Sequence, residues 1–390
     1  MNVQDLLAAH TALRTKNSIN LIPSENIMSP AAFQALSNDL SGRYHAEWYG
    51  GTTHIQELLS LVKELACQLF NAEKAWITPL SGNIAVLTAL FAFSSPDDGV
   101  AALPFTHGGY PLDYSYFQRK HIHLAYSQEE LTLDTEENCR ILEKEQPPLV
   151  FLGASLIPFP HPVREITRCV HDYGGIVVYD GSHPLGLIAG GQFQDPLRDG
   201  ADVLLGSTHK SFPGPQGGIV LASDQFSEEI EKAIGEDPLK GIVLVDNVHN
   251  GRIAALGITI EEMLLNGKKY AKQVIKNSHG LARGFQEGHL NLLTRSDGRA
   301  TDSHQVILPS ESLEIGARMR DKLAQYRIFG DAGMRFGTGE VTRKGYTEED
   351  MVTIGRLISE ILQEKADSGL KQKFLKQIRE LAEMHPSVVL

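Results

Sequence analysis

Lys210 and Asp180 are the residues whose types and positions point most directly to chemistry. The apolar segment Val203–Leu205, expected as a strand, leads into Gly206-Ser207-Thr208-His209-Lys210 and then into a loop rich in glycine and proline. A second expected strand, Gly175–Asp180, ends on the aspartate. A lysine and an aspartate at the carboxyl ends of neighbouring strands suit pyridoxal phosphate. The lysine can form the Schiff base, and the aspartate can keep the pyridine nitrogen protonated.

Each of these residues has an ordinary explanation when taken alone. A lysine near a strand end is usually solvated, and an aspartate after a strand is usually a turn former. Here the lysine stands among small residues and glycines, and the aspartate closes a strand that reads as fully buried. The combination therefore favours a cofactor site.

An anion site is predicted at Ser81-Gly82-Asn83. This tripeptide separates an expected strand, Lys74–Leu80, from an expected apolar helix, Ile84–Phe93. Small polar residues at a helix start leave backbone N–H groups and a hydroxyl free to bind a phosphate. By itself the tripeptide is more typical of a helix N-cap, but its position upstream of Asp180 and Lys210 suits a phosphate loop.

Several blocks together resemble the serine hydroxymethyltransferase family, whose members are fold-type-I pyridoxal phosphate enzymes. The similarity covers roughly residues 15 to 350. The blocks occur in the family's order: Leu21–Asn26 (LIPSEN), Tyr44–Gly51 (YHAEWYGG), Ser81–Asn83 (SGN), His107–Gly109 (HGG), Gly153–Ser155 (GAS), Asp180–His183 (DGSH), Ser207–Lys210 (STHK) and Met334–Thr338 (MRFGT). Each block is weak alone, and the register of all of them makes the resemblance strong.

The resemblance implies roles for individual residues. Four are expected to be catalytic: Lys210, which would carry the cofactor, Asp180, His107 and Glu47, which would handle protons at the substrate side chain. The expected cofactor contacts are Ser81, Gly82, Asn83, His107, Ser155, Asp180, His183, His209 and Lys210. The expected substrate contacts are Ser24, Tyr44, Tyr49 and Arg335, the last as a two-pronged clamp on the amino-acid carboxylate. The alternatives are structural roles for His107 and His183 and a surface ion pair for Arg335.

Two departures from the family's pattern concern the folate half of its site. An insert that follows the glutamate in the family is absent here, because Glu47 leads directly into Trp48-Tyr49-Gly50-Gly51. A long loop before the late arginine is also absent, since residues 325–335 leave no room for it. Gln216 replaces an arginine of the family, and no glycine-rich phosphate loop of the partner subunit precedes Asn247. Tetrahydrofolate is therefore a doubtful cofactor, whereas pyridoxal phosphate, covalent on Lys210, is retained.

The sequence favours an enzyme that makes or breaks the Cα–Cβ bond of a β-hydroxy amino acid of the serine, threonine or glycine type. We expect a folate-independent aldolase or transaldolase. The alternatives are a folate-dependent serine–glycine hydroxymethyltransferase and a transaminase or β-eliminating lyase on the same scaffold. A non-catalytic paralogue would not need to keep Lys210, Asp180 and Arg335 together.

Composition limits the partners. The chain has 390 residues, 42% of them hydrophobic and 22% charged, with a net charge of −12. This charge disfavours binding to nucleic acid or to an anionic membrane. Neither a secretion signal nor a membrane span is evident, and we expect a cytoplasmic homodimer with shared active sites. Cys67, Cys139 and Cys169 are not spaced for a zinc site, and we expect buried thiols in a reducing compartment.

The order of elements predicts an α/β fold of the aspartate aminotransferase type. Short apolar strands alternate with amphipathic helices over residues 26–245, which indicates a mostly parallel sheet covered on both faces. A long helix is expected over Val248–Phe285, followed by shorter strands and closing helices. We expect an amino-terminal helix and arm over residues 1–25, a cofactor-binding domain over 26–270 and a small α+β domain over 271–390.

Overall fold

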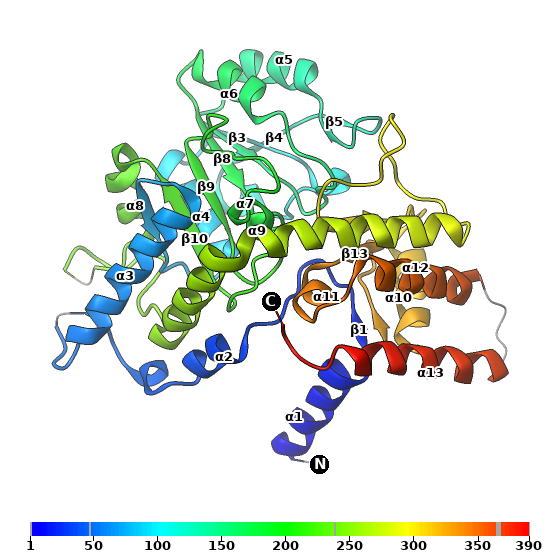
Figure 1. The fold of residues 1–390 in the computed structure, drawn as a ribbon. Helices are drawn as coiled ribbons and strands as arrows, with labels where there is room; N and C mark the ends of the chain where they lie inside the picture. The colour runs from blue at the N-terminus through cyan, green and yellow to red at the C-terminus, as the bar shows by residue number, and fades with distance from the viewer. Residues whose placement is uncertain (1, 47, 238, 364–367, 390) are drawn as a thin grey trace. The chain divides into compact units, whose positions relative to one another are not determined.

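The computed structural model describes all residues except 1, 47, 238, 364–367 and 390. The chain divides into two compact units (Figure 1). One comprises Met28–Lys268, and the other combines Met1–Ile27 with Lys269–Leu390. The division falls inside the long helix α9 (Asn250–Glu287), and the expected amino-terminal arm groups with the carboxyl-terminal unit.

The larger unit is built on one seven-stranded sheet. Its strands lie side by side in the order β2 (Lys74–Trp76), β10 (Gly218–Ala222), β9 (Val203–Ser207), β8 (Ile176–Asp180), β7 (Leu149–Leu152), β3 (Gly99–Ala102) and β4 (Lys120–His123). Strand β10 runs antiparallel to both of its neighbours, and the remaining pairs are parallel. The predicted α/β class with a mostly parallel sheet is confirmed.

Helices, several of which pack against the sheet, make up much of the rest of the larger unit (Figure 1). They are α2 (Pro30–Leu36), α3 (Thr53–Phe70), α4 (Gly82–Phe93), α5 (Thr135–Glu145), α6 (Val163–His171), α7 (Leu185–Ala189), α8 (Ser227–Ile234) and the first part of α9. Short 3-10 turns occur at Asp39–Gly42, Phe105–His107, Tyr114–Phe117 and Asp224–Phe226, and β5 (Tyr126–Ser127) pairs with β6 (Thr132–Leu133). All residues of β7, β9 and β10 are buried, which explains why these strands carry no charged side chain.

One strand boundary differs from the prediction and one strand was missed, each for an identifiable reason. The strand expected over Lys74–Leu80 ends at Trp76, and Pro79 follows, which has no N–H to donate to a ladder. Strand β4, which carries two histidines and a lysine and lies at the sheet edge, was not predicted. A half-exposed edge strand lacks the apolar run that marks a buried one.

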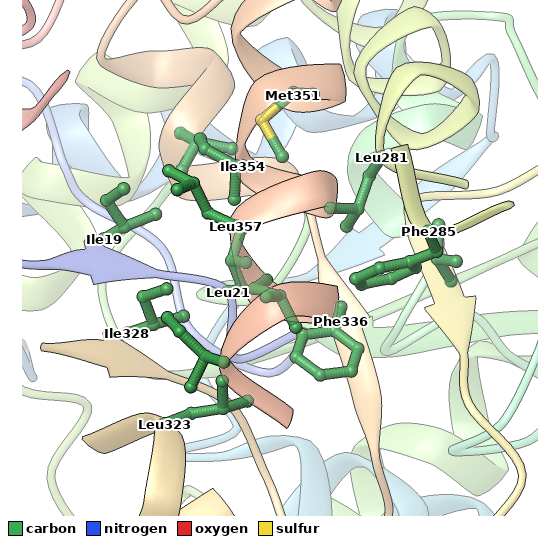
Figure 2. Packing of buried hydrophobic residues seen from close by; sticks show 14 of the residues in the cluster. Ile19, Leu21, Leu281, Phe285, Leu323, Ile328, Phe336, Met351, Ile354 and Leu357 are labelled. Atoms are coloured by element: carbon green, nitrogen blue, oxygen red, sulfur yellow. The ribbon is translucent and has the colours of Figure 1, made fainter. Parts of the chain in front are cut away.

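The smaller unit is an α+β arrangement. Its elements are α1 (Val3–Thr11), a π-helical turn (Ala12–Lys16), β1 (Ile19–Asn20), β11 (Gln305–Ile307), α10 (Leu313–Ala324), β12 (Ile328–Phe329), β13 (Arg335–Gly337), α11 (Gly339–Arg343), α12 (Glu348–Gln363), α13 (Ser368–Met384) and the last part of α9. Strands β1 and β12 pair in parallel, and β11 and β13 pair antiparallel. Figure 2 shows Leu21, Phe285, Phe336 and Leu357 converging in its core, where the two phenylalanine ring centroids are 5.3 Å apart.

The expectation of three buried thiols is wrong for two of the cysteines. Cys139 on α5 and Cys169 on α6 form a disulfide, and both are only half-buried. Cys67 on α3 is a free, half-buried thiol. The two bonded cysteines lie on adjacent helices, a proximity that their separation in sequence does not reveal.

No helix in the part of the chain that the structure describes is long and apolar enough to cross a membrane.

Candidate active site

A cavity of about 180 Å³ lies in the larger unit, at the carboxyl ends of the central strands. Most of the residues expected to bind the cofactor line it. The lining comprises Ser81, Gly82, Asn83, Val86, Tyr110, Ala154, Ser155, Asp180, Ser182, His183, Ser207, His209 and Lys210. Blocks that are far apart in the sequence therefore meet at one edge of the sheet.

The loops that follow β8 and β9 are tied to each other. Asp180 is the last residue of β8 and pairs in register with Leu205 of β9, so Lys210 leaves the neighbouring strand end. Ser211 Oγ donates to the backbone carbonyl of His183 and accepts from the N–H of Gly186 at 3.0 Å. The lysine loop and the histidine loop are thus fixed together by buried hydrogen bonds.

The carboxylate of Asp180 is oriented by its own loop. Its Oδ1 accepts a hydrogen bond of 2.9 Å from the N–H of Ser182. Oδ2 makes no hydrogen bond to another protein group in the described part of the chain, so this oxygen can face a ligand in the cavity. The preceding residue, Tyr179, is fully buried, and burial raises the pKa of its hydroxyl above the usual range.

The amino terminus of α4 supplies the expected anion site. Ser81 is the N-cap, and its Oγ accepts from the N–H of Ile84 at 3.2 Å, which leaves the hydroxyl hydrogen available as a donor. The N–H groups of Gly82 and Asn83 belong to the first turn and have no helical carbonyl to bond to. A Cβ at Gly82 would overlap with Ser207 Oγ, so any other residue at this position would force that hydroxyl to move.

Ser155 reaches the cavity because of an unusual backbone. Gly153 has φ of +113°, and a Cβ there would collide with the carbonyl of Asp180. The N–H of Ser155 donates to the carbonyl of Gly108 at 2.7 Å, so the 107–109 loop is held against the 153–155 loop. His107 itself is exposed and is not part of the cavity lining. Its ring stacks against Tyr126 with centroids 6.1 Å apart.

The structure does not place the expected substrate contacts in this lining. Ser24 and Arg335 belong to the smaller unit. Arg335 Nε and Nη2 contact Asp331 Oδ2 at 3.0 and 2.8 Å, so the carboxylate holds one edge of the guanidinium.

Tyr44 and Tyr49 belong to the larger unit and stack with ring centroids 4.5 Å apart. They line a separate cavity of about 240 Å³ together with Trp48, whose side chain is largely exposed. Glu47, the other expected site residue of the Tyr44–Gly51 block, is outside the residues that the structure describes.

Sequence reasoning missed Tyr110, Ser182, Ser207, Val86 and Ala154 as cavity residues. Ser182 and Ser207 fall inside recognised blocks, so their positions alone were a usable signal. Tyr110 directly follows the His107–Gly109 block, but only the path of the loop brings its hydroxyl within 3.0 Å of Asn83 Oδ1.

A model of the family described as serine hydroxymethyltransferase matches residues 1–358. The chain belongs to this family. The serine hydroxymethyltransferase of Methanopyrus kandleri is 35% identical over 93% of this chain and 89% of its own length. That of Methanobrevibacter smithii is 36% identical over 96% of this chain and 91% of its own length.

One solved structure similar to this chain is of an enzyme with a different activity. The L-threonine transaldolase from Pseudomonas fluorescens, in its internal aldimine state, superposes with a TM-score of 0.90 and 25% identity over 98% of this chain and 91% of that chain. The protein is therefore a pyridoxal-phosphate-dependent enzyme of the transferase or aldolase type with the fold-type-I architecture.

The residues of the cavity fit this cofactor chemically. A helix amino terminus with a serine N-cap suits a phosphate, a carboxylate suits a protonated pyridine nitrogen, and a lysine amine suits a carbonyl carbon. All three kinds of group line the same cavity, at Ser81, Asp180 and Lys210.

Proposed function

We propose that this enzyme makes or breaks the Cα–Cβ bond of a β-hydroxy amino acid of the serine or threonine type, and that it does so without folate. The observation that carries the proposal is the short turn before Arg335. Residues 330–334 alone connect β12 to β13, and the carbonyl of Asp331 accepts from the N–H of Met334 at 3.1 Å. This closed turn replaces the long loop that the family uses for folate.

Within this proposal, the larger unit holds the cofactor. When bound, pyridoxal phosphate supplies an electron sink for the bond at the substrate's Cα. Lys210 Nζ would be the point of covalent attachment and could carry a proton to or from Cα. Asp180 Oδ2 would hold the proton on the pyridine nitrogen, and Ser81 with the first turn of α4 would bind the phosphate.

The remaining expected residues act on the substrate. Arg335 orients the amino-acid carboxylate with its guanidinium group, and Ser24 assists. The family resemblance would place His107 over one face of the cofactor ring, although here its ring stacks on Tyr126 outside the cavity lining. Glu47 and Tyr49 act at the substrate side chain, and Tyr44 stacks behind Tyr49.

The alternative is folate-dependent hydroxymethyl transfer between serine and glycine. The names of the archaeal relatives favour it, because these proteins are serine hydroxymethyltransferases at about 35% identity. The transaldolase neighbour and the short turn favour the folate-independent reaction.

Isotope exchange and product analysis separate the two reactions. We expect glycine to exchange its α-proton in D₂O, and threonine to release acetaldehyde, without folate, and tetrahydrofolate to leave both rates nearly unchanged. Lys210→Ala serves as the inactive control. A large increase in glycine exchange on adding tetrahydrofolate, together with transfer of the serine hydroxymethyl group to it, would restore the folate-dependent reaction.

We further propose that the enzyme is a cytoplasmic homodimer in which the Tyr44–Gly51 block serves the partner's active site. The exposed Trp48, Tyr44 and Tyr49 side chains support this arrangement, because large exposed aromatics mark interaction surfaces. Mixing Lys210→Ala with Tyr49→Phe subunits should restore part of the activity. Full activity in a monomer, measured by sedimentation, would exclude shared sites.

A further inference from the structure

Tyr110 places its hydroxyl on a residue of the phosphate site. Tyr110 Oη donates a hydrogen bond of 3.0 Å to Oδ1 of Asn83, and both residues line the cavity that contains Asp180 and Lys210. Asn83 stands in the first turn of α4, directly after Ser81 and Gly82. The phenol therefore acts on the amide side chain of this turn, which presents an acceptor at one end and a donor at the other.

The hydrogen bond selects which end of the amide faces the ligand. An asparagine amide has a carbonyl oxygen that only accepts and an NH₂ group that only donates. A phosphate dianion offers only acceptor oxygens, so it is stabilised by the NH₂ group and repelled by the carbonyl oxygen. Because Tyr110 engages Oδ1, the NH₂ group is the end left for a phosphate. No other protein group in the described ranges uses Asn83 Nδ2.

The environment keeps the phenol in its donor form. Burial, and then the negative charge of Asp180, raise the pKa of Tyr110 above its ordinary value. The hydroxyl therefore stays protonated at neutral pH. A serine at position 83 would need no such partner, since a hydroxyl rotates to suit either role.

We propose that Tyr110 is a positioning residue of the cofactor site, which orients the Asn83 amide so that Nδ2 donates to the phosphate of pyridoxal phosphate. The inference rests on the proposed assignment of this cavity to the cofactor. In this proposal the Asn83 NH₂ group donates to the phosphate together with the Ser81 hydroxyl and the first-turn N–H groups. Tyr110, which lies outside α4, sets the direction of this NH₂ group.

Comparing ligands with and without a phosphate tests this role. The apoprotein is titrated with pyridoxal phosphate, with pyridoxal and with inorganic phosphate. The variants are Tyr110→Phe, Asn83→Ala and the double variant. The control is Tyr116→Phe, a tyrosine that is 81% exposed and does not line the cavity.

We expect Tyr110→Phe to weaken binding of pyridoxal phosphate and of inorganic phosphate by about 3- to 10-fold, as one hydrogen bond would, and to leave pyridoxal binding unchanged. Asn83→Ala should do the same, and the double variant should lose no more than the single ones, because both act through one contact.

Equal weakening of pyridoxal and pyridoxal phosphate in Tyr110→Phe would show a merely structural role and overturn the inference. Unchanged phosphate affinity, or losses that multiply in the double variant, would also overturn it. If Tyr110→Phe leaves binding unchanged while the wild type binds pyridoxal phosphate covalently through Lys210, only the Tyr110 role fails. If the wild type does not bind it through Lys210, the assignment of the cavity fails as well.

Discussion

The Oγ of Ser182 accepts a hydrogen bond of 3.0 Å from the backbone N–H of Ser207. Ser182 lies two residues after Asp180, and Ser207 ends the strand that leads to Lys210. The loops that carry Asp180 and Lys210 are therefore fixed relative to each other by the buried hydrogen bond between Ser182 and Ser207. Such fixed geometry favours catalysis, because the groups do not need to reorganise during the reaction.

Replacement of Lys210 should abolish covalent attachment of the cofactor. Lys210→Ala removes the lysine amine of this cavity, so borohydride treatment should add no cofactor mass to the protein. Mass spectrometry of the reduced protein measures this. Lys144→Ala, on the exposed side of α5, is the matched control and should label like the wild type. Labelling of Lys210→Ala at another lysine would show that the attachment site is elsewhere.

Asp180→Asn should keep the cofactor bound but slow the reaction. An amide cannot hold the proton on the pyridine nitrogen, although it can still accept the hydrogen bond from the N–H of Ser182. By analogy with the removal of a single electrostatic contact, we expect a fall in kcat of roughly 10²–10³-fold. Steady-state kinetics together with the bound cofactor content measure it, and near-normal turnover would contradict the pairing.

The sheet-edge residues could be predicted from the sequence because parallel strands bring their carboxyl ends to one edge. Asp180 ends one such strand, Lys210 lies just after the end of the next, and Ser81 caps the helix that follows another. The fold class and most cavity residues can therefore be predicted from where apolar runs end in the sequence. These patterns depend on local spacing, which a single sequence contains.

Contacts between loops could not be predicted in this way. The hydrogen bond from Tyr110 to Asn83 depends on the path of the chain after Gly109, and the Cys139–Cys169 bond depends on how α5 packs against α6. Neither pair has a fixed spacing in sequence. Strand β4 was missed because its residues are polar and half-exposed, so its apolar pattern is weak.

Arg335→Lys should weaken amino-acid binding. A lysine ammonium is a point charge and cannot make the two-pronged contact of a guanidinium, which costs about 10- to 100-fold in affinity. Titration with glycine measures the change. Arg318→Lys, on an exposed face of α10, is the control. If Arg335→Lys leaves the midpoint of the glycine titration unchanged, other residues bind the amino-acid carboxylate.

Acidification should destabilise the enzyme through His161. This side chain is buried, and burial lowers its pKa to about 4. An unfolded histidine has a pKa of about 6.5, so the unfolded state binds a proton first as the pH falls. The contribution of neutral His161 to the free energy of unfolding is therefore fully present above about pH 6.5. It is lost as the pH falls towards 4, by at most about 3 kcal/mol.

Urea unfolding of the wild type and of His161→Asn between pH 7 and 4 tests whether His161 causes this loss of stability. Asparagine can keep a polar contact with Thr132, whose Oγ1 lies 2.8 Å from His161 Nδ1, but it does not titrate. The variant should lose less stability than the wild type over this range. His10→Asn, exposed on α1, should follow the wild type. Parallel curves for the wild type and His161→Asn would assign the acid sensitivity to other groups.

Reduction of the Cys139–Cys169 disulfide should lower the free energy of unfolding. The bond links residues with a sequence separation of 30, and closing a loop of this size restricts the unfolded chain by about 2–4 kcal/mol. Urea unfolding with and without a dithiol reductant measures the difference. Cys139→Ser should behave like the reduced wild type, whereas Cys67→Ser should keep the full response, because Cys67 is a free thiol. Without reductant, the denatured wild type should show one reactive thiol per chain. Three reactive thiols and no effect of the reductant would show that α5 and α6 are held together by packing alone.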